Sequence, residues 1–286
     1  MLRSLFYGVG MSKTELMGAI PDGIARQNVM KEEFGWEVPV EAIPLPSRGS
    51  LYDPDSVLYN RDTLKIKSMT AHEEDILASP AFHKDGTVIT QLIKSCLTDS
   101  AVNPEDLILG DRISLMVGIR VTGYGPAYAA KANCKSCGHL NSFEADLSAL
   151  EIKRLKIKPV VEGKNEFEFT LPVTKKKVTF KYLTGAEERL RNQASKNESK
   201  VLGLKIEKTV TSYLENTIVS VEGVTDRLKI KHFIHNMPAF DSKKLRSFIV
   251  DNEPGINMSH SLTCESCGAS SDVSLPITSE FFWPST

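Results

Sequence analysis

The residues best suited to chemistry in this sequence are four cysteines arranged as two CxxC pairs. Cys134 and Cys137 form the first pair, Cys264 and Cys267 form the second, and a glycine directly follows each pair. A CxxC turn brings two thiolates to one side of a tight bend, and the glycine can adopt the positive φ that such a bend needs. Because structural zinc takes four ligands in a tetrahedral arrangement, the two pairs predict one closed, non-catalytic zinc site per chain.

The long interval between the pairs leaves other interpretations open. Residues 138–263 separate them, far more than the roughly 15–20 residues of an ordinary zinc ribbon. We therefore expect two halves of one ribbon joined across an insertion. The alternatives are free thiols, disulfides formed on oxidation, and redox chemistry. A redox CxxC begins a helix, whereas strand-like segments follow both pairs here. His139 and His260 are possible substitute ligands, but four thiolates already complete the site.

Motifs for catalysis are incomplete or missing in the sequence. The stretch HEEDI from His72 to Ile76 begins like an HExxH metalloprotease helix, but isoleucine stands where the second histidine is required. The sequence contains no GxxxxGK[ST] phosphate loop, no GxGxxG after a predicted strand and no GxSxG elbow. We therefore expect no enzymatic activity.

Charge and hydropathy narrow the classes of partner. The chain has 35 basic and 36 acidic side chains, a formal net charge of -1, so it creates no bulk field that would attract nucleic acid or an anionic membrane. No apolar run approaches the roughly 20 residues of a membrane span, and the first residues do not read as a signal peptide. CxxC pairs in such a chain favour a reducing compartment. We expect a cytoplasmic protein without membrane contact.

The segment before the first CxxC pair reads as mixed and mainly helical. Prolines and Gly49 predict an ordered loop or edge strand over residues 38–53, and Leu64 and Ile66 alternate with lysines as in a half-buried strand. Thr70 and Glu73 form a capping box for a helix that should end near Pro80. Further helices are predicted over residues 88–97, where Cys96 lies on the apolar face, after Asn103-Pro104, and from Gly110 to Gly123.

The segment between the pairs predicts a hairpin followed by helices. Residues 167–171 and 178–182 alternate between apolar and polar around a lysine-rich turn, as hairpin strands do. Thr184 and Glu187 form a capping box for a charged helix. Further helices are expected at residues 205–216, 225–235 and 241–251, the last capped by Asp241.

These patterns together predict an α+β fold with a discontinuous four-cysteine zinc ribbon. Ser12 and Glu15 indicate a short capped helix within an N-terminal arm. The predicted organisation is an arm at residues 1–36, a mainly helical unit at 37–130, two ribbon halves at 131–150 and 257–286, and an inserted α+β unit at 151–256.

Several segments in combination resemble a known family. They are LPSRGSLY from Leu45 to Tyr52, the MTAHEEDIL helix start, GDRISLMVGIRVTGYG with Asp111 and Arg112, both CxxCG pairs, and the terminal FFWP. The chain thus resembles the baseplate hub subunit and hub assembly proteins of contractile-tailed bacteriophages of the T-even type. The resemblance implies a structural or assembly role in the virion baseplate or in the host cytoplasm during assembly. It also implies contacts with other baseplate or tail proteins, or self-association, and no catalysis.

Candidate partner contacts are Arg48 in the LPSRG loop and the aromatic residues Phe281, Phe282 and Trp283. Aromatic side chains near a chain end are costly to leave in water, so they either anchor in a neighbouring subunit or fold back onto their own chain. Arg48 is either a partner contact or is solvated or paired within the chain. The alternative function is a zinc-ribbon nucleic-acid-binding protein, which the near-neutral charge disfavours.

Overall fold

The computed structural model describes residues 31–202, 209–277 and 279–282. The chain divides into two units, Met1–Pro39 and Val40–Thr286. In the first unit residues 31–34 are helical, and Lys31 forms an ion pair with Glu37. The helix predicted from Ser12 lies outside the described residues. Everything that follows concerns the second unit, which has the mixed α+β composition expected from the sequence.

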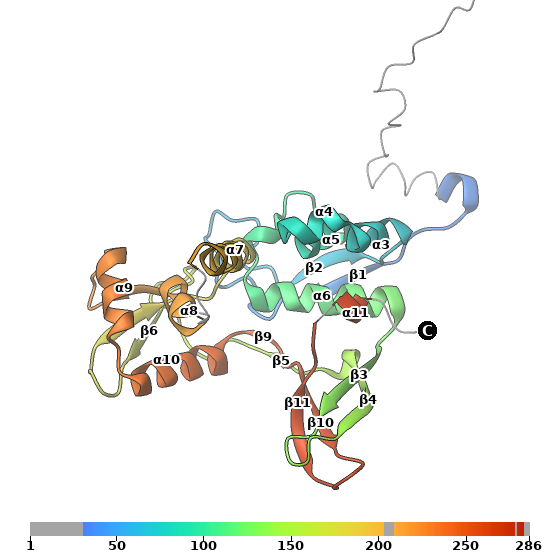
Figure 1. The fold of residues 1–286 in the computed structure, drawn as a ribbon. Coiled ribbons are helices and arrows are strands. Elements are labelled where there is room, and N and C mark those ends of the chain that lie inside the picture. The colour runs from blue at the N-terminus through green and yellow to red at the C-terminus, as the bar shows by residue number, and fades with distance from the viewer. Residues whose placement is uncertain (1–30, 203–208, 278, 283–286) are drawn as a thin grey trace, which may run out of the picture. The chain divides into compact units, whose positions relative to one another are not determined.

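The N-terminal part of this unit packs a two-stranded sheet and three short helices around one long helix (Figure 1). The antiparallel pairing of Ile43 with Leu64 confirms a strand at residues 64–66 and places another within residues 38–53. The capping box of Thr70 and Glu73 is also present. The elements are β1 (Val40–Pro44), β2 (Thr63–Lys67), α3 (Ala71–Ala78), α4 (Pro80–Asp85), α5 (Val88–Cys96) and α6 (Leu109–Tyr124).

One expectation for this region is confirmed and another needs correction. Helix α3 ends at Ala78, near Pro80 as predicted, and this proline then starts α4, where its missing N–H costs nothing. After Asn103 the chain makes only the single 3-10 turn η1 (Pro104–Asp106), in which the Asn103 side chain accepts a hydrogen bond from the Glu105 amide. Cys96 is fully buried on the inner face of α5, as expected.

Helix α6 makes contact with much of this unit. Its first turn meets β9 (Gly255–Ile256), which pairs with β5 (Ile152–Lys153). These two short strands lie at the start and the end of the inserted segment, so their pairing closes that segment at its base. Backbone approaches α6 so closely there that a Cβ on Gly110 would lie 1.7 Å from the carbonyl oxygen of Pro254.

We expect Gly110→Ala to lower the free energy of unfolding by about 1–3 kcal/mol, because backbone must move to admit the methyl group. Urea unfolding followed by circular dichroism measures this. Gly255→Ala is the matched control from the other side of the same contact, since its Cβ would meet only the Gly110 Cα at 3.5 Å, an ordinary contact distance. Equal stability of the two variants would contradict the close approach.

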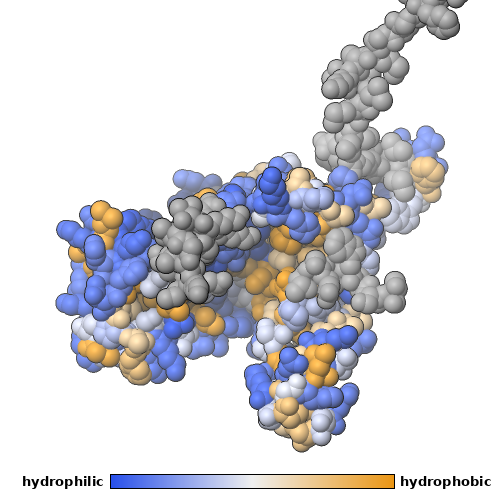
Figure 2. All heavy atoms as spheres, viewed as in Figure 1, coloured by the Kyte–Doolittle hydropathy of each residue, from blue (hydrophilic) through white to orange (hydrophobic). Residues whose placement is uncertain are grey.

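The inserted segment contains a three-stranded antiparallel sheet rather than the predicted hairpin alone. Strand β8 (Ile218–Val221) adds to the free edge of the second hairpin strand, β7 (Lys177–Phe180). The sequence predicted a helix near each of the four helices that the structure describes in this segment. The remaining elements are β6 (Phe167–Thr170), β7 (Lys177–Phe180), α7 (Gly185–Leu202), α8 (Thr209–Thr217), α9 (Arg227–His235) and α10 (Ala239–Asn252). Figure 2 shows hydrophobic residues in small groups on a largely hydrophilic surface over this segment.

Asp241 does not cap α10 as predicted. The helix begins earlier, at Ala239 after Pro238, so Asp241 lies in its first turn. Its carboxylate instead accepts hydrogen bonds from the Val173 amide at 2.7 Å and from the amide and hydroxyl of Thr174. These hydrogen bonds hold the pKa of Asp241 below its usual value against the opposing effect of burial. The residue therefore ties the β6–β7 turn to α10.

Candidate metal centre

Two hairpins carry the four cysteines and bring them together. Cys134 and Cys137 lie in the turn between β3 (Ala127–Asn133) and β4 (Leu140–Asp146). Cys264 and Cys267 lie in the turn between β10 (Ser259–Thr263) and β11 (Ser270–Ser274). All four sulfur atoms lie within 4.8 Å of one another. Segments separated by more than a hundred residues in the printed sequence thus form one cluster, as Figure 1 shows for the two hairpins.

The two cysteine turns have the same backbone geometry. In the first, the Cys134 amide donates to the His139 carbonyl at 2.8 Å and the Gly138 amide donates to the Cys134 carbonyl at 2.9 Å. The corresponding distances in the second turn, from Cys264 to Ala269 and from Gly268 to Cys264, are both 2.9 Å. Gly138 and Gly268 have φ values of 75° and 70°, where a side chain would be strained. The repeated CxxCG sequence therefore encodes a repeated turn.

The sulfur spacing fits one tetrahedral metal ion. Cys134 Sγ lies 3.7 Å from Cys267 Sγ, and Cys137 Sγ lies 3.7 Å from Cys264 Sγ. A tetrahedron with metal–sulfur bonds of about 2.3 Å has edges of about 3.8 Å. The four cysteines, whose sulfur atoms all lie within 4.8 Å of one another, can therefore hold one metal ion.

The electrostatics of the cluster also suit a cation. Hydrogen bonding from the Cys267 backbone lowers the pKa of Cys264 to about 6, and that from the Cys137 backbone lowers the pKa of Cys134. The Ala269 amide also lowers the pKa of Cys267. Hydrogen bonds with Cys137 and the other thiols outweigh this effect and raise the pKa of Cys267 to about 12. Four thiolates this close repel one another, and a divalent cation removes that repulsion.

Residues other than the four cysteines fix one hairpin against the other. The side chain of Asn141, 1% exposed, accepts a hydrogen bond from the Glu265 amide at 3.0 Å and donates to the His139 carbonyl at 2.9 Å. Lys135 donates to the Asp272 carbonyl. His260 stacks on Phe143 with ring centroids 4.7 Å apart, and among the described residues the ligand cluster contains no histidine. Sequence reasoning missed Asn141, because nothing local marks an asparagine near the start of a strand as buried.

A family model described as T4 bacteriophage base plate protein matches residues 45–283. The chain belongs to this family. No curated protein and no solved structure shows significant similarity to it. A phage baseplate protein belongs in the virion baseplate, among other tail proteins. The match confirms the resemblance to phage baseplate proteins that the sequence showed. Within the described residues, no helix of this baseplate protein combines the length and the apolar character that crossing a membrane requires.

A buried carboxylate explains two of the segments that carry the family resemblance. Asp111 on α6 is fully buried and accepts hydrogen bonds from the amide and hydroxyl of Ser47 at 3.0 and 2.6 Å, and from the Tyr52 hydroxyl at 2.6 Å. Burial raises the pKa of Asp111. The LPSRGSLY loop is thus tied to the GDRISL start of α6. The signal in the sequence was the GDRISL segment, in which Asp111 lies in the first turn of a predicted helix.

The structure places three of the four candidate partner contacts. Arg48 is exposed at a left-handed backbone position with φ 54°, and among the described residues its guanidinium has no hydrogen bond or ion pair. Phe281 and Phe282 in α11 (Ser279–Phe282) are 0% and 1% exposed within the chain. Trp283 lies outside the described residues. A partner contact at the two phenylalanines would require the tail to leave α6, so Arg48 is the candidate already presented to solvent.

Proposed function

We propose that this chain is a structural or assembly component of the phage baseplate hub, that it binds one structural zinc ion per chain, and that it acts without catalysis. The observation that supports this most directly is the four-sulfur cluster within a chain of the base plate protein family. An all-thiolate tetrahedral site suits zinc, and a site filled by four protein ligands leaves no position for a reacting water.

The role of the metal follows from the connectivity. When bound, the ion crosslinks the β3–β4 hairpin to the β10–β11 hairpin and so stabilises their packing. The pairing of β5 with β9 closes the inserted segment at a second point. Arg120 holds the C-terminal tail at a third, by donating from Nε to the Phe281 carbonyl at 2.8 Å. Such a crosslinked unit suits a protein that docks as a preformed block between neighbouring subunits.

The LPSRG loop is the surface that we assign to a neighbouring hub or tail protein. The buried network of Ser47, Tyr52 and Asp111 holds the loop, while Arg48 projects from it with its guanidinium free. Because the loop backbone is already held, only the arginine side chain loses conformational entropy when it pairs with a partner's carboxylate. Phe281, Phe282 and Trp283 remain candidates for contact only if the tail is released during assembly.

Disrupting the gene in its phage tests the proposed role. We expect infected cells to accumulate incomplete baseplates or free tubes without finished tails, as seen by negative-stain electron microscopy. Peptides of this chain in purified particles identify a retained hub subunit, whereas their absence identifies an assembly factor. Finished, infectious tails in the absence of the gene would overturn the proposal. Salt-sensitive filter binding of DNA or RNA would support the nucleic-acid alternative instead.

Arg48→Ala tests the assigned surface. We expect the variant to fold normally but to restore tail assembly about tenfold less efficiently in the disrupted phage, because one arginine anchor contributes on the order of 1–2 kcal/mol. Arg61→Ala is the control, since Arg61 pairs with Asp99 in the same chain at 2.6 Å. Full complementation by Arg48→Ala would remove this residue from the interface.

A further inference from the structure

One face of helix α10 is open to solvent from its first turn to its last. Its residues follow one another at intervals of three or four, so they form a single row along the helix. The core packs against the opposite side of the helix, where Leu245 and Ile249 are buried. We call the exposed row the α10 face, and its members are Phe240, Lys243, Ser247 and Val250.

The β6–β7 turn extends the α10 face at its Phe240 end. Asp241 is fully buried and accepts hydrogen bonds from the amides of Val173 and Thr174 at 2.7 and 3.0 Å. These bonds fix the turn beside the first turn of α10. Val173 and Phe240 are nevertheless each 53% exposed. Two apolar side chains are thus held in solvent on backbone that needs no further ordering to bind a partner.

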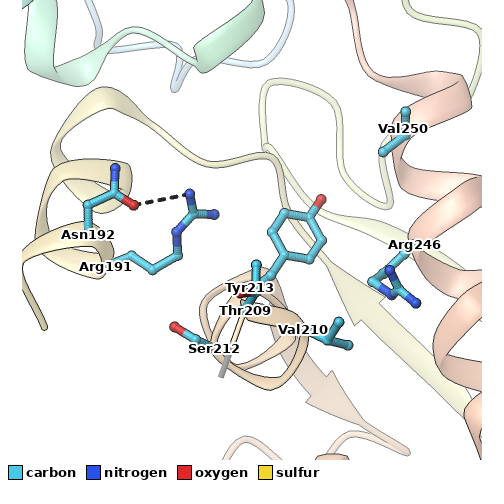
Figure 3. Close-up of a pocket in the computed structure, with 8 residues that line it drawn as sticks. All are labelled: Arg191, Asn192, Thr209, Val210, Ser212, Tyr213, Arg246 and Val250. Carbon is cyan, nitrogen blue, oxygen red and sulfur yellow. Dashed lines mark hydrogen bonds between the residues drawn. The ribbon is translucent and has the colours of Figure 1, made fainter. Parts of the chain in front are cut away.

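A second pair of exposed apolar side chains lies at the Val250 end. Val250 on α10 and Val210 on α8 are 54% and 40% exposed. Both line the cavity shown in Figure 3, which has a volume of about 430 Å³. At the helical rise of about 1.5 Å per residue, this end lies about 15 Å from Phe240. The α10 face therefore has an apolar contact point at each end.

Lysines lie around the Phe240 end without acidic partners. The side chains of Lys175, Lys176 and Lys243 are exposed, and within the described part of the chain they make no hydrogen bond or ion pair. The Lys244 ammonium lies over the Phe240 ring, 5.5 Å from its centre. Four lysines are thus available to a partner.

The nearby carboxylates do not neutralise these four lysines. Asp241 is buried and occupied by the backbone of the turn. Glu222 accepts a hydrogen bond from the Lys177 amide at 2.9 Å, and Glu168 forms an ion pair with the Lys177 ammonium at 3.1 Å. Even with the charges of Asp241 and Glu222 counted against them, the four lysines leave an excess of positive charge. Such a surface favours an acidic partner.

We propose that the α10 face and the β6–β7 turn bind an acidic amphipathic segment of a neighbouring baseplate protein, an inference that rests on the proposed function. Apolar side chains of that segment contact Val173 and Phe240 at one end and enter the cavity beside Val250 at the other. Its carboxylates pair with the lysines. An amphipathic helix of about three turns spans the distance. DNA or RNA fits less well, because aliphatic side chains such as Val173 and Val250 offer no ring on which a base can stack.

Complementation of the phage in which the gene is disrupted tests this surface. Lys175→Glu combined with Lys243→Glu is expected to lower the titre at least about tenfold, because like charges then face each other across the interface. Phe240→Ser should have an effect of similar size, because it removes an aromatic anchor. Thermal melting shows that each variant is folded.

The control reverses the same number of charges elsewhere. Lys65→Glu combined with Lys158→Glu changes two exposed lysines whose side chains, like those of the α10 face, are unpaired among the described residues. This variant should complement fully. Second-site substitutions that restore the titre of the Lys175→Glu, Lys243→Glu variant are expected to replace acidic residues of another tail protein.

Three outcomes separate this proposal from its competitors. Full complementation by either folded variant of the α10 face would overturn it. Finished tails in the absence of the gene would contradict the proposed function instead. Filter binding of DNA by the native chain, lost in the Lys175→Glu, Lys243→Glu variant, would assign the lysines to nucleic acid and overturn the acidic protein partner.

Discussion

Cys264→Ser is expected to abolish binding of the proposed zinc ion and to unfold the two hairpins that carry the cysteines. The four sulfurs form one cluster, so the loss of one thiolate opens the tetrahedron. Structural zinc in small modules supplies on the order of 10 kcal/mol of apparent binding free energy, which here is linked to the folding of the hairpins. Cys134→Ser should have the same effect, although the two residues lie in different hairpins.

Elemental mass spectrometry of purified protein, together with the molar mass in solution, measures this loss. Native protein should contain one zinc per chain, and each serine variant close to none. Hydrogen exchange should become fast in β3, β4, β10 and β11, while β6 and β7 keep their protection. Cys96→Ala is the control, because Cys96 is buried in α5 and belongs to no ligand cluster among the described residues. Native protein without metal, or a metal shared by two chains, would contradict the intrachain site.

Arg120→Met is expected to lower the free energy of unfolding by about 3–5 kcal/mol, because three carbonyls lose their donor at once. Arg120 is 1% exposed and donates to the carbonyl oxygens of Phe281, Gly125 and Ala127 at 2.8, 2.6 and 2.9 Å. Its guanidinium also lies over the Tyr124 ring. Methionine fills part of the volume but supplies no donor.

Release of the C-terminal tail should accompany this loss of stability. Phe281, whose ring meets that of Tyr128 at 5.2 Å, would lose the hydrogen bond to its carbonyl. Urea unfolding measures the stability, and limited proteolysis followed by mass spectrometry measures access to the tail. Arg61→Met is the matched control, because its partly exposed pair with Asp99 contributes at most about 1 kcal/mol. A change of less than about 1 kcal/mol in Arg120→Met would show that the tail is held by other contacts.

Local sequence patterns predicted the fold class and most of the helices, because their signals lie within a few residues of one another. The capping box of Thr70 and Glu73 marked the start of α3, and the apolar spacing through residues 88–97 marked α5. The metal cluster was also predictable, since four thiolates in two CxxCG turns have few other stable uses. Each of these inferences needs only residue identity and short spacing.

Contacts between distant segments were decided only by the tertiary structure. Asp241 has the residue type of a helix cap, yet its hydrogen bonds go to the β6–β7 turn because α10 begins earlier. Strand β8 follows a helix and gives no local hairpin signal, so its pairing with β7 was missed. Arg120 reads as the polar side of an amphipathic helix, but the returning C-terminal tail buries it.

The sequence by itself determined which side chains could bind a metal and where most helices form. It did not determine which backbone groups Arg120 would meet, or that Arg191, Tyr213 and Arg246 would line one cavity. The physical reason is that hydrogen bonds and the interactions between charges depend on distance in space. For residues far apart in the chain, that distance exists only after the core has packed.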